Sequence, residues 1–195
     1  MLMKYTLPKT AMVGGKELEI RTDFRVILEI ITMLNDPDLD GQDKAEALLE
    51  MFYVHPELIT DAKGAVDECY EFIDMGDKRS KKSARLVDWD QDFNYIIAPV
   101  NRVLGREARD VPYDIETNTG GLHWWTFMSA YMEIGGDCLF SQIVSIRDKR
   151  ARGEKLEKYE RKWATRNAGI VDLKQKFSEQ ENDLAREWTG GGKNS

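Results

Sequence analysis

The sequence contains few cysteines and histidines, the residues that form disulfides, bind zinc and take part in nucleophilic catalysis. Its 195 residues include two cysteines and two histidines. Because Cys69 and Cys138 stand apart inside helical patterns, we expect no disulfide framework and interpret both as small buried side chains in a reducing compartment. Neither His55 nor His123 lies within the short spacing, about two to five residues, that chelating pairs share. The pattern therefore supports neither a zinc site nor a histidine-activated nucleophile.

Long apolar runs are also missing. The stretch "VILEIITML" (26–34) is interrupted by Glu29 and is much shorter than the roughly 20 apolar residues that cross a bilayer. The N-terminal "MLMKYTLPK" (1–9) lacks the apolar centre of a signal peptide. We therefore expect no membrane association and a cytoplasmic location.

Charge is plentiful but unevenly distributed. Hydrophobic residues make up 42% of the chain and charged residues 32%, as in ordinary folded domains, and the net charge is −7. Residues 146–195 carry 13 Lys and Arg against 9 Asp and Glu, whereas residues 1–145 carry 15 against 26. The overall acidity argues against nucleic acid as a partner. The asymmetry is typical of self-association or a charged partner, and solvated helix faces would account for it equally well.

The pattern of apolar residues predicts an all-α fold. The segment "TAMVGGKELEIR" (10–21) predicts a β-hairpin, because Gly14-Gly15 supplies the positive φ angles of a tight turn. Everything after it shows helical spacing, including a helix that begins at Asp88, with Gln91 in a capping box, and ends at Gly105. We expect about seven helices around a central Trp-rich helix. The predicted organisation is a core domain (1–153) containing the hairpin (1–21), a long amphipathic C-terminal helical segment (154–188) and a disordered tail (189–195).

The expected central helix is "GGLHWWTFMSAYMEIGGDC" (120–138). Apolar side chains cover well over half of its circumference, which is typical of a buried helix, and Ala130 lies on the remaining, outer face. Trp124 and Trp125 would then belong to the core, and His123, in the first turn, would be a hydrogen-bonded packing residue. The alternative is an aromatic groove that accepts a partner's helix.

The segment "DPDLDGQDKAE" (36–46) resembles a calcium-binding loop. Asp36, Asp38 and Asp40 occupy the first, third and fifth positions of such a loop, and a glycine follows. Glu46, the candidate bidentate ligand, comes one residue too early. The alternative is a loop whose aspartates end one helix and cap the next.

The C-terminal segment carries an apolar stripe at heptad spacing. Its members are candidates for a partner-binding or self-association face: Leu156, Tyr159, Trp163, Ile170, Leu173 and Phe177. Two points stay open at this stage. The segment is either one bent helix or two, and the stripe either binds a partner or packs on the chain's own core.

Two stretches carry a resemblance to a known family. "DWDQDFNYIIAPVNRVLG" (88–105), followed by "LHWWTFMSAYMEIGGDCLFSQIVSIRDKR" (122–150), resembles the phage gene-product-fifteen family. Proteins of that family have an acidic helix start, then a helix that begins His-Trp-Trp, then a helix that ends in an Ile-Arg dipeptide. The resemblance implies a helical protein encoded next to the tape-measure gene of long-tailed phages.

The same resemblance implies a function. It predicts a tail assembly chaperone in the host cytoplasm that coats the tape-measure protein and hands it over as the tail-tube protein polymerises. The family brings no catalytic residues and no cofactor, so we expect no enzyme. A structural virion component, in the tail or in head completion, is the alternative, and a calcium-binding regulator acting through residues 36–46 is a more remote one.

Overall fold

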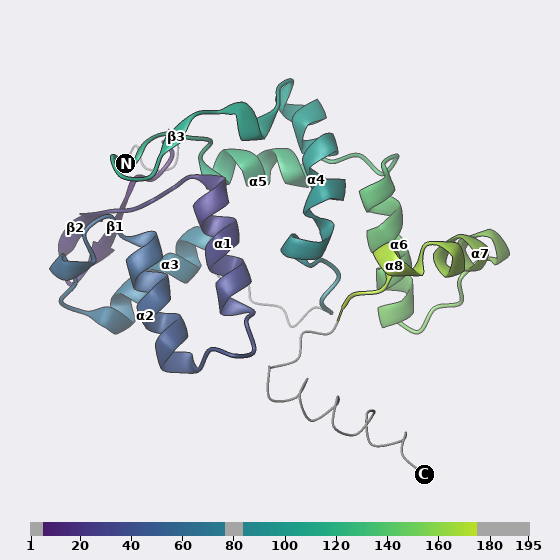
Figure 1. Ribbon diagram of the computed structural model, residues 1–195, viewed down its shortest axis with the longest axis horizontal. Coiled ribbons are helices and arrows are strands. Elements are labelled where there is room, and N and C mark those ends of the chain that lie inside the picture. The colour runs from purple at the N-terminus through teal and green to yellow at the C-terminus, as the bar shows by residue number, and fades with distance from the viewer. Residues whose placement is uncertain (1–5, 77–83, 175–195) are drawn as a thin grey trace, which may run out of the picture.

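The computed structural model describes residues 6–76 and 84–174, and within them it confirms a mostly helical protein (Figure 1). The expected N-terminal hairpin is present as β1 (Thr10–Val13) and β2 (Lys16–Glu19), which pair antiparallel. Gly14 and Gly15 have φ angles of 56° and 79°, as a tight two-residue turn requires.

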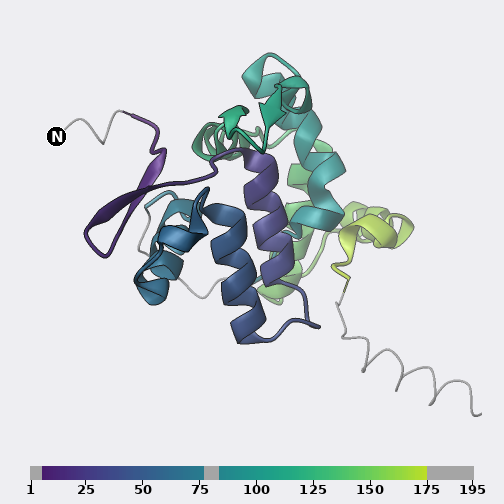
Figure 2. The same cartoon turned by 60° about the vertical axis from the view of Figure 1, so that its left-hand side comes forward.

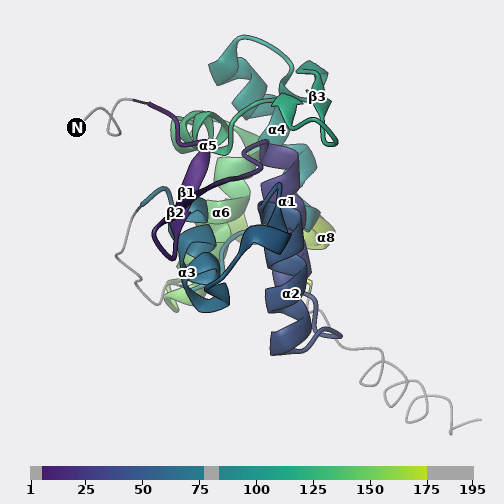
Figure 3. The same ribbon diagram turned by 90° about the vertical axis from the view of Figure 1, so that its left-hand side faces the viewer.

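Three helices follow and form one half of the molecule: α1 (Phe24–Leu34), α2 (Gly41–Phe52) and α3 (Ala62–Ile73). The hairpin lies against α3 (Figure 3). A short 3-10 turn, η2 (Pro56–Leu58), joins α2 to α3. The buried hydroxyl of Tyr53 donates a 2.9 Å hydrogen bond to the carbonyl of Ala65 and so ties these two helices together.

The fourth helix, α4 (Trp89–Leu104), begins and ends as the sequence predicts, at an Asp88 N-cap and at Gly105 in the left-handed conformation. The capping box predicted at Asp88 is wrong in its second residue, Gln91. The carboxylate of Asp92, not the side chain of Gln91, accepts the hydrogen bond from the Asp88 backbone amide at 2.9 Å. Gln91 instead bonds the backbone of Asp172 and Lys174.

A second hairpin, which the sequence analysis missed, follows α4 and the 3-10 turn η3 (Ala108–Asp110). Its strands are β3 (Tyr113–Asp114) and β4 (Thr119–Gly120). The Asp114 carboxylate accepts hydrogen bonds from the amides of Glu116 and Thr117, and Asn118 adopts a φ of 49°. Strands of two residues are too short to show alternation, so side-chain chemistry in the turn carries this structure.

The expected central helix is α5 (Trp124–Met132), and it contacts α1 and α4 (Figure 2). It is shorter and less enclosed than its composition predicts. Met132 is 60% exposed, whereas Ala130, expected on the outer face, is buried. Both indole nitrogens donate to the end of α3: Trp124 to the Ile73 carbonyl, and its neighbour Trp125 to that of Phe72, each at 2.9 Å.

The remaining helices form a second, smaller core at the other end of the molecule (Figure 1). They are α6 (Leu139–Ala151), α7 (Lys158–Arg166) and α8 (Ala168–Val171). As far as residue 174, the C-terminal segment is thus two short helices, broken at Asn167, rather than one long one. The tail predicted for residues 189–195 lies outside the described residues.

In the described ranges, no helix has both the length and the apolar character needed to cross a membrane.

Candidate binding groove between α1 and α4

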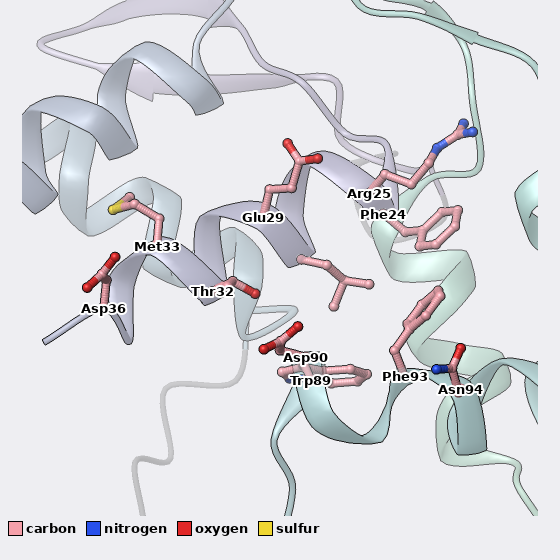
Figure 4. Close-up of a pocket in the computed structure, with 11 residues that line it drawn as sticks. Phe24, Arg25, Glu29, Thr32, Met33, Asp36, Trp89, Asp90, Phe93 and Asn94 are labelled. Carbon is pink, nitrogen blue, oxygen red and sulfur yellow. The ribbon is translucent and has the colours of Figure 1, made fainter. Parts of the chain in front are cut away.

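A groove of about 580 Å³ runs between α1 and the first half of α4 (Figure 4). Its walls carry a mixture of apolar and acidic side chains. The residues that line it are Phe24, Arg25, Leu28, Glu29, Thr32, Met33 and Asp36 of α1 and its C-terminal end, and Trp89, Asp90, Phe93 and Asn94 of α4. The groove is open to solvent rather than an enclosed cavity, so a partner can reach it from the surface.

The bottom of the groove rests on the aromatic face of α5. The Trp89 ring lies 5.0 Å from the Tyr131 ring, centroid to centroid, and 5.9 Å from the Trp124 ring. Phe24 stacks on Phe127 at 4.6 Å with the two rings nearly parallel. Because these rings pack against the rings of α5, the floor of the groove is a firm apolar surface.

The rim of the groove is acidic. Glu29 and Asp36 on the α1 side and Asp90 on α4 supply three carboxylates (Figure 4). The guanidinium of Arg25, at one end, is held by the Asp23 carboxylate at 2.7 Å and donates to the Val111 carbonyl at 3.0 Å. A hydrogen bond to Asp23 raises the pKa of Arg25 above its usual value. The geometry favours a ligand with an apolar stripe and positive charges beside it.

The angle between α1 and α5 is fixed by the buried carboxylate of Asp23. As the N-cap of α1, Asp23 accepts from the Arg25 amide at 3.0 Å, and its second oxygen accepts from the Leu122 amide at 2.8 Å. Gly121 comes so close that an added Cβ would lie 2.5 Å from that second oxygen. One side chain therefore begins α1 and positions the chain that enters α5.

The other wall is held in place by a buried ion pair between α4 and α6. Arg147 donates to both carboxylate oxygens of Asp92, at 2.6 and 3.0 Å. Its remaining N–H groups donate to the carbonyls of Leu86, Ile170 and Val171 at 2.7–2.9 Å. A two-point pair of this kind sets orientation as well as distance. It joins α4, α6 and α8 at a single point.

Both partners of this ion pair belong to stretches that carry the resemblance noted in the sequence, the acidic start of α4 and the Ile-Arg dipeptide of α6. The family model described as Bacteriophage Gp15 protein matches residues 3–173. The chain belongs to this family. It is accordingly a phage protein of the structural or morphogenesis class. No curated protein and no solved structure matched the chain.

In this Gp15 family member, the His-Trp-Trp motif has a structural role. His123 is the N-cap of α5: its Nδ1 accepts from the Trp125 amide at 3.1 Å, and its Nε2 donates to the Pro8 carbonyl at 2.8 Å. Burial lowers the pKa of His123 below its usual value. As predicted, the residue is a hydrogen-bonded packing residue, and it joins the N-terminal segment to α5.

Two of the carboxylates proposed for calcium, Asp36 and Asp40, serve the local backbone. Asp40 is the N-cap of α2 and accepts from the amides of Gln42 and Asp43, which lowers its pKa. Asp36 accepts from the Asp38 amide at 2.9 Å, and Glu46 accepts from the Gln42 side chain at 3.0 Å. Within the described ranges, no three Asp, Glu, His or Cys side chains come together as a metal site.

The side chains of the C-terminal stripe differ in how far they are buried. Leu156, Trp163 and Ile170 are partly buried against the second core, which contains Ile146 of α6. Tyr159 is 67% exposed. Of the other two candidates, Leu173 is half-buried and Phe177 lies outside the described residues. Three of the five described members of the stripe therefore pack on the chain itself, which was one of the two interpretations left open.

Sequence reasoning identified both walls of the groove but not the groove itself. Leu28 and Trp89 each lie in a segment with helical spacing of apolar residues, which indicates that a helix face is covered without showing what covers it. The two helices are brought together by hydrogen bonds that Asp23 and Asp92 make to residues far away in the sequence. The spacing of apolar residues along either helix does not reveal these bonds.

Proposed function

We propose that this protein is a non-catalytic tail assembly chaperone of a long-tailed phage. In the host cytoplasm it binds the tape-measure protein, keeps it soluble and releases it as tail-tube protein assembles. The observation that carries the proposal is the groove between α1 and α4, with its apolar floor and acidic rim. Family membership supports the setting in phage morphogenesis.

The groove is suited to one amphipathic helix. With a rise of about 1.5 Å per residue, the 11 residues of α1 offer a wall of roughly 16 Å, or three turns of a bound helix. Apolar side chains of the ligand would contact Leu28, Met33 and Phe93, and flanking Lys or Arg would meet the acidic rim. Apolar contact gives affinity, while surface charge chiefly gives selectivity and fast, reversible binding.

Co-expression with the tape-measure protein tests the proposal. We expect a soluble complex on a sizing column, and we expect Glu29→Lys, which reverses charge on the rim, to weaken it about tenfold. Glu50→Lys makes the same change on the exposed face of α2 and should bind like wild type. An insoluble tape measure with no complex in the presence of wild-type protein would refute the chaperone function.

Mass spectrometry of purified virions addresses the structural alternative. A chaperone is absent from virions or present at a small fraction of the copy number of tail subunits. Stoichiometric recovery with the tail would identify a structural component instead.

A further inference from the structure

The outer face of α7 is basic. Every Lys and Arg within the helix is exposed, namely Lys158, Arg161, Lys162 and Arg166. The one acidic residue within its bounds, Glu160, is buried and pairs on the inner face with Lys149 of α6 at 2.5 Å. Because the helix turns its carboxylate inward and its cations outward, it leaves a positively charged surface at this end of the molecule.

An aromatic pair lies beside these cations. Tyr159 is largely exposed, and Trp163, one turn further along the helix, is only partly buried against the second core. On the helical wheel, Lys162 and Arg166 lie next to this pair, on its solvent side. The face thus combines an apolar stripe with positive charges beside it, which is the ligand that the groove between α1 and α4 favours.

The groove and α7 also match in charge and in length. The rim of the groove carries Glu29 and Asp36, opposite in sign to the face of α7. The same division runs through the sequence, where residues 1–145 hold an excess of acidic side chains and residues 146–195 an excess of basic ones. The nine residues of α7 span about 14 Å, against roughly 16 Å for the α1 wall.

The two surfaces lie apart within one molecule. Helix α7 packs on the second core at the end far from the N-terminal hairpin, and α6 and α8 lie between it and α4 (Figure 1). Its basic face is therefore presented to other molecules rather than to the groove of its own chain.

We propose that α7 of one copy docks in the groove between α1 and α4 of a second copy. Tyr159 and Trp163 contact the apolar floor of the groove, and the cations beside them meet the carboxylates of its rim. That the tape-measure protein then competes with α7 for the groove rests on the proposed function, whereas the contact between copies does not.

The contact is heterologous, because the groove and α7 are different surfaces. Each copy that joins still offers a free groove at one end and a free α7 at the other, so association continues into a ring or an open chain. One short helix in a groove buries less than about 1,200 Å², the range of weak and transient interfaces. We therefore expect a Kd in the micromolar range and a mass that grows with concentration.

Two variants, each with one damaged surface, test the contact by light scattering. E29K/T32K places positive charge in the groove and leaves α7 intact, whereas Y159A/K162E changes α7 and leaves the groove intact. None of the four side chains is buried, so both variants should fold. Wild type should exceed the mass of a dimer at high concentration. Each variant alone should bind itself at least about tenfold more weakly and stay near the 22.5 kDa of one chain.

A mixture of the two variants gives the sharpest result. The intact α7 of E29K/T32K fits the intact groove of Y159A/K162E, and the remaining two surfaces are damaged. The mixture should therefore form a dimer, at twice the mass of one chain, and nothing larger. A mixture that stays monomeric would overturn the inference. So would wild type that stays monomeric, or a dimer in either variant alone, which would place the interface elsewhere.

The matched control makes the same two changes on α3. Y70A/K63E replaces an exposed tyrosine and an exposed lysine, so it alters the net charge as Y159A/K162E does. It should associate like wild type. Loss of association in this variant as well would show that net charge, and not the face of α7, governs assembly, contrary to the inference.

The scattering experiments contain no tape-measure protein, so their failure leaves the co-expression test of the proposed function unaffected. Conversely, Y159A/K162E keeps an intact groove. If the proposed function holds, this variant should still form the soluble complex with the tape-measure protein, whether or not copies of the chain associate with one another.

Discussion

The guanidinium of Arg147 and the carboxylate of Asp92 form a two-point ion pair inside the protein, with side chains that are 5% and 0% exposed. Removing one partner of a buried pair leaves the other charge uncompensated, which typically costs about 3–5 kcal/mol. We expect Arg147→Lys to lose part of this free energy, since an ammonium group keeps the positive charge but cannot make the same fork of hydrogen bonds. Urea denaturation of the wild type and of Arg147→Lys measures the difference in the free energy of unfolding.

The control for this prediction is Arg102→Lys. Arg102 lies 3.3 Å from Asp137, and both side chains are more than half exposed. Exposed pairs contribute little, so the change should be below about 0.5 kcal/mol. Equal effects at the two positions would show that the buried pair does not hold α4 to α6.

Stability should depend on pH through His123. Burial lowers its pKa below the ordinary 6.5, so the unfolded chain binds the proton more readily than the folded one. The contribution of His123 is therefore complete above about pH 6.5 and is lost as the pH falls through the lowered pKa. Denaturation series at pH 7.5, 6.5 and 5.5 should show a fall in the free energy of unfolding.

Substitution of each histidine by asparagine shows which one causes the pH dependence of stability. His123→Asn should flatten it, because asparagine also caps helices but does not titrate here. His55→Asn changes an imidazole that is 58% exposed and should retain the wild-type slope. A slope that survives in His123→Asn would assign the dependence to other groups.

Calcium should leave the protein unchanged. Asp40 is engaged as the cap of α2, and Asp36 accepts from the following turn. We expect no shift of Tm with millimolar calcium in a thermal melt. Asp40→Ala should lower Tm by about 3 °C with or without calcium, whereas Asp40→Asn, which can still cap, should be near neutral. A calcium-dependent rise of Tm in wild type that Asp40→Asn abolishes would restore the metal-loop hypothesis.

The C-terminal stripe can be divided by substitution into packing and binding positions. Trp163→Ala should lower the free energy of unfolding by about 2 kcal/mol, because half-buried indole surface leaves the second core. Tyr159→Ala, at a 67% exposed side chain, should change it by less than about 0.5 kcal/mol. If Tyr159→Ala nevertheless weakens the complex with the tape-measure protein, the exposed part of the stripe contributes to binding.

Local signals account for most of the fold that could be predicted. The turn at Gly14-Gly15, the cap at Asp88 and the stop at Gly105 each depend on neighbours a few residues away, and each is found where the sequence places it. The orientation of α5 could not be predicted. Its apolar residues surround the axis, so no periodicity reveals that the face with Ala130 turns inward while Met132 is left exposed.

The candidate site escaped prediction for a related reason. An apolar stripe indicates that one face of a helix is covered, but it does not show which element or partner covers it. The two walls of the groove are brought together by Asp23, which reaches the Leu122 amide about a hundred residues away, and by Asp92 with Arg147. Aspartates at helix starts are ordinary caps in a sequence, and their second, long-range partners become visible only in the folded chain.

The hydrogen bonds of Arg147 limit which residues this position can hold in related phage proteins. A guanidinium has five N–H donors, and all five are used here, two by Asp92 and three by backbone carbonyls. A compensating change at Asp92 could remove the charge but would leave three backbone carbonyls without these donors. A substitution at Asp92 alone therefore does not restore what a change at Arg147 removes. The position should stay fixed while the surface of the groove diverges with its ligand.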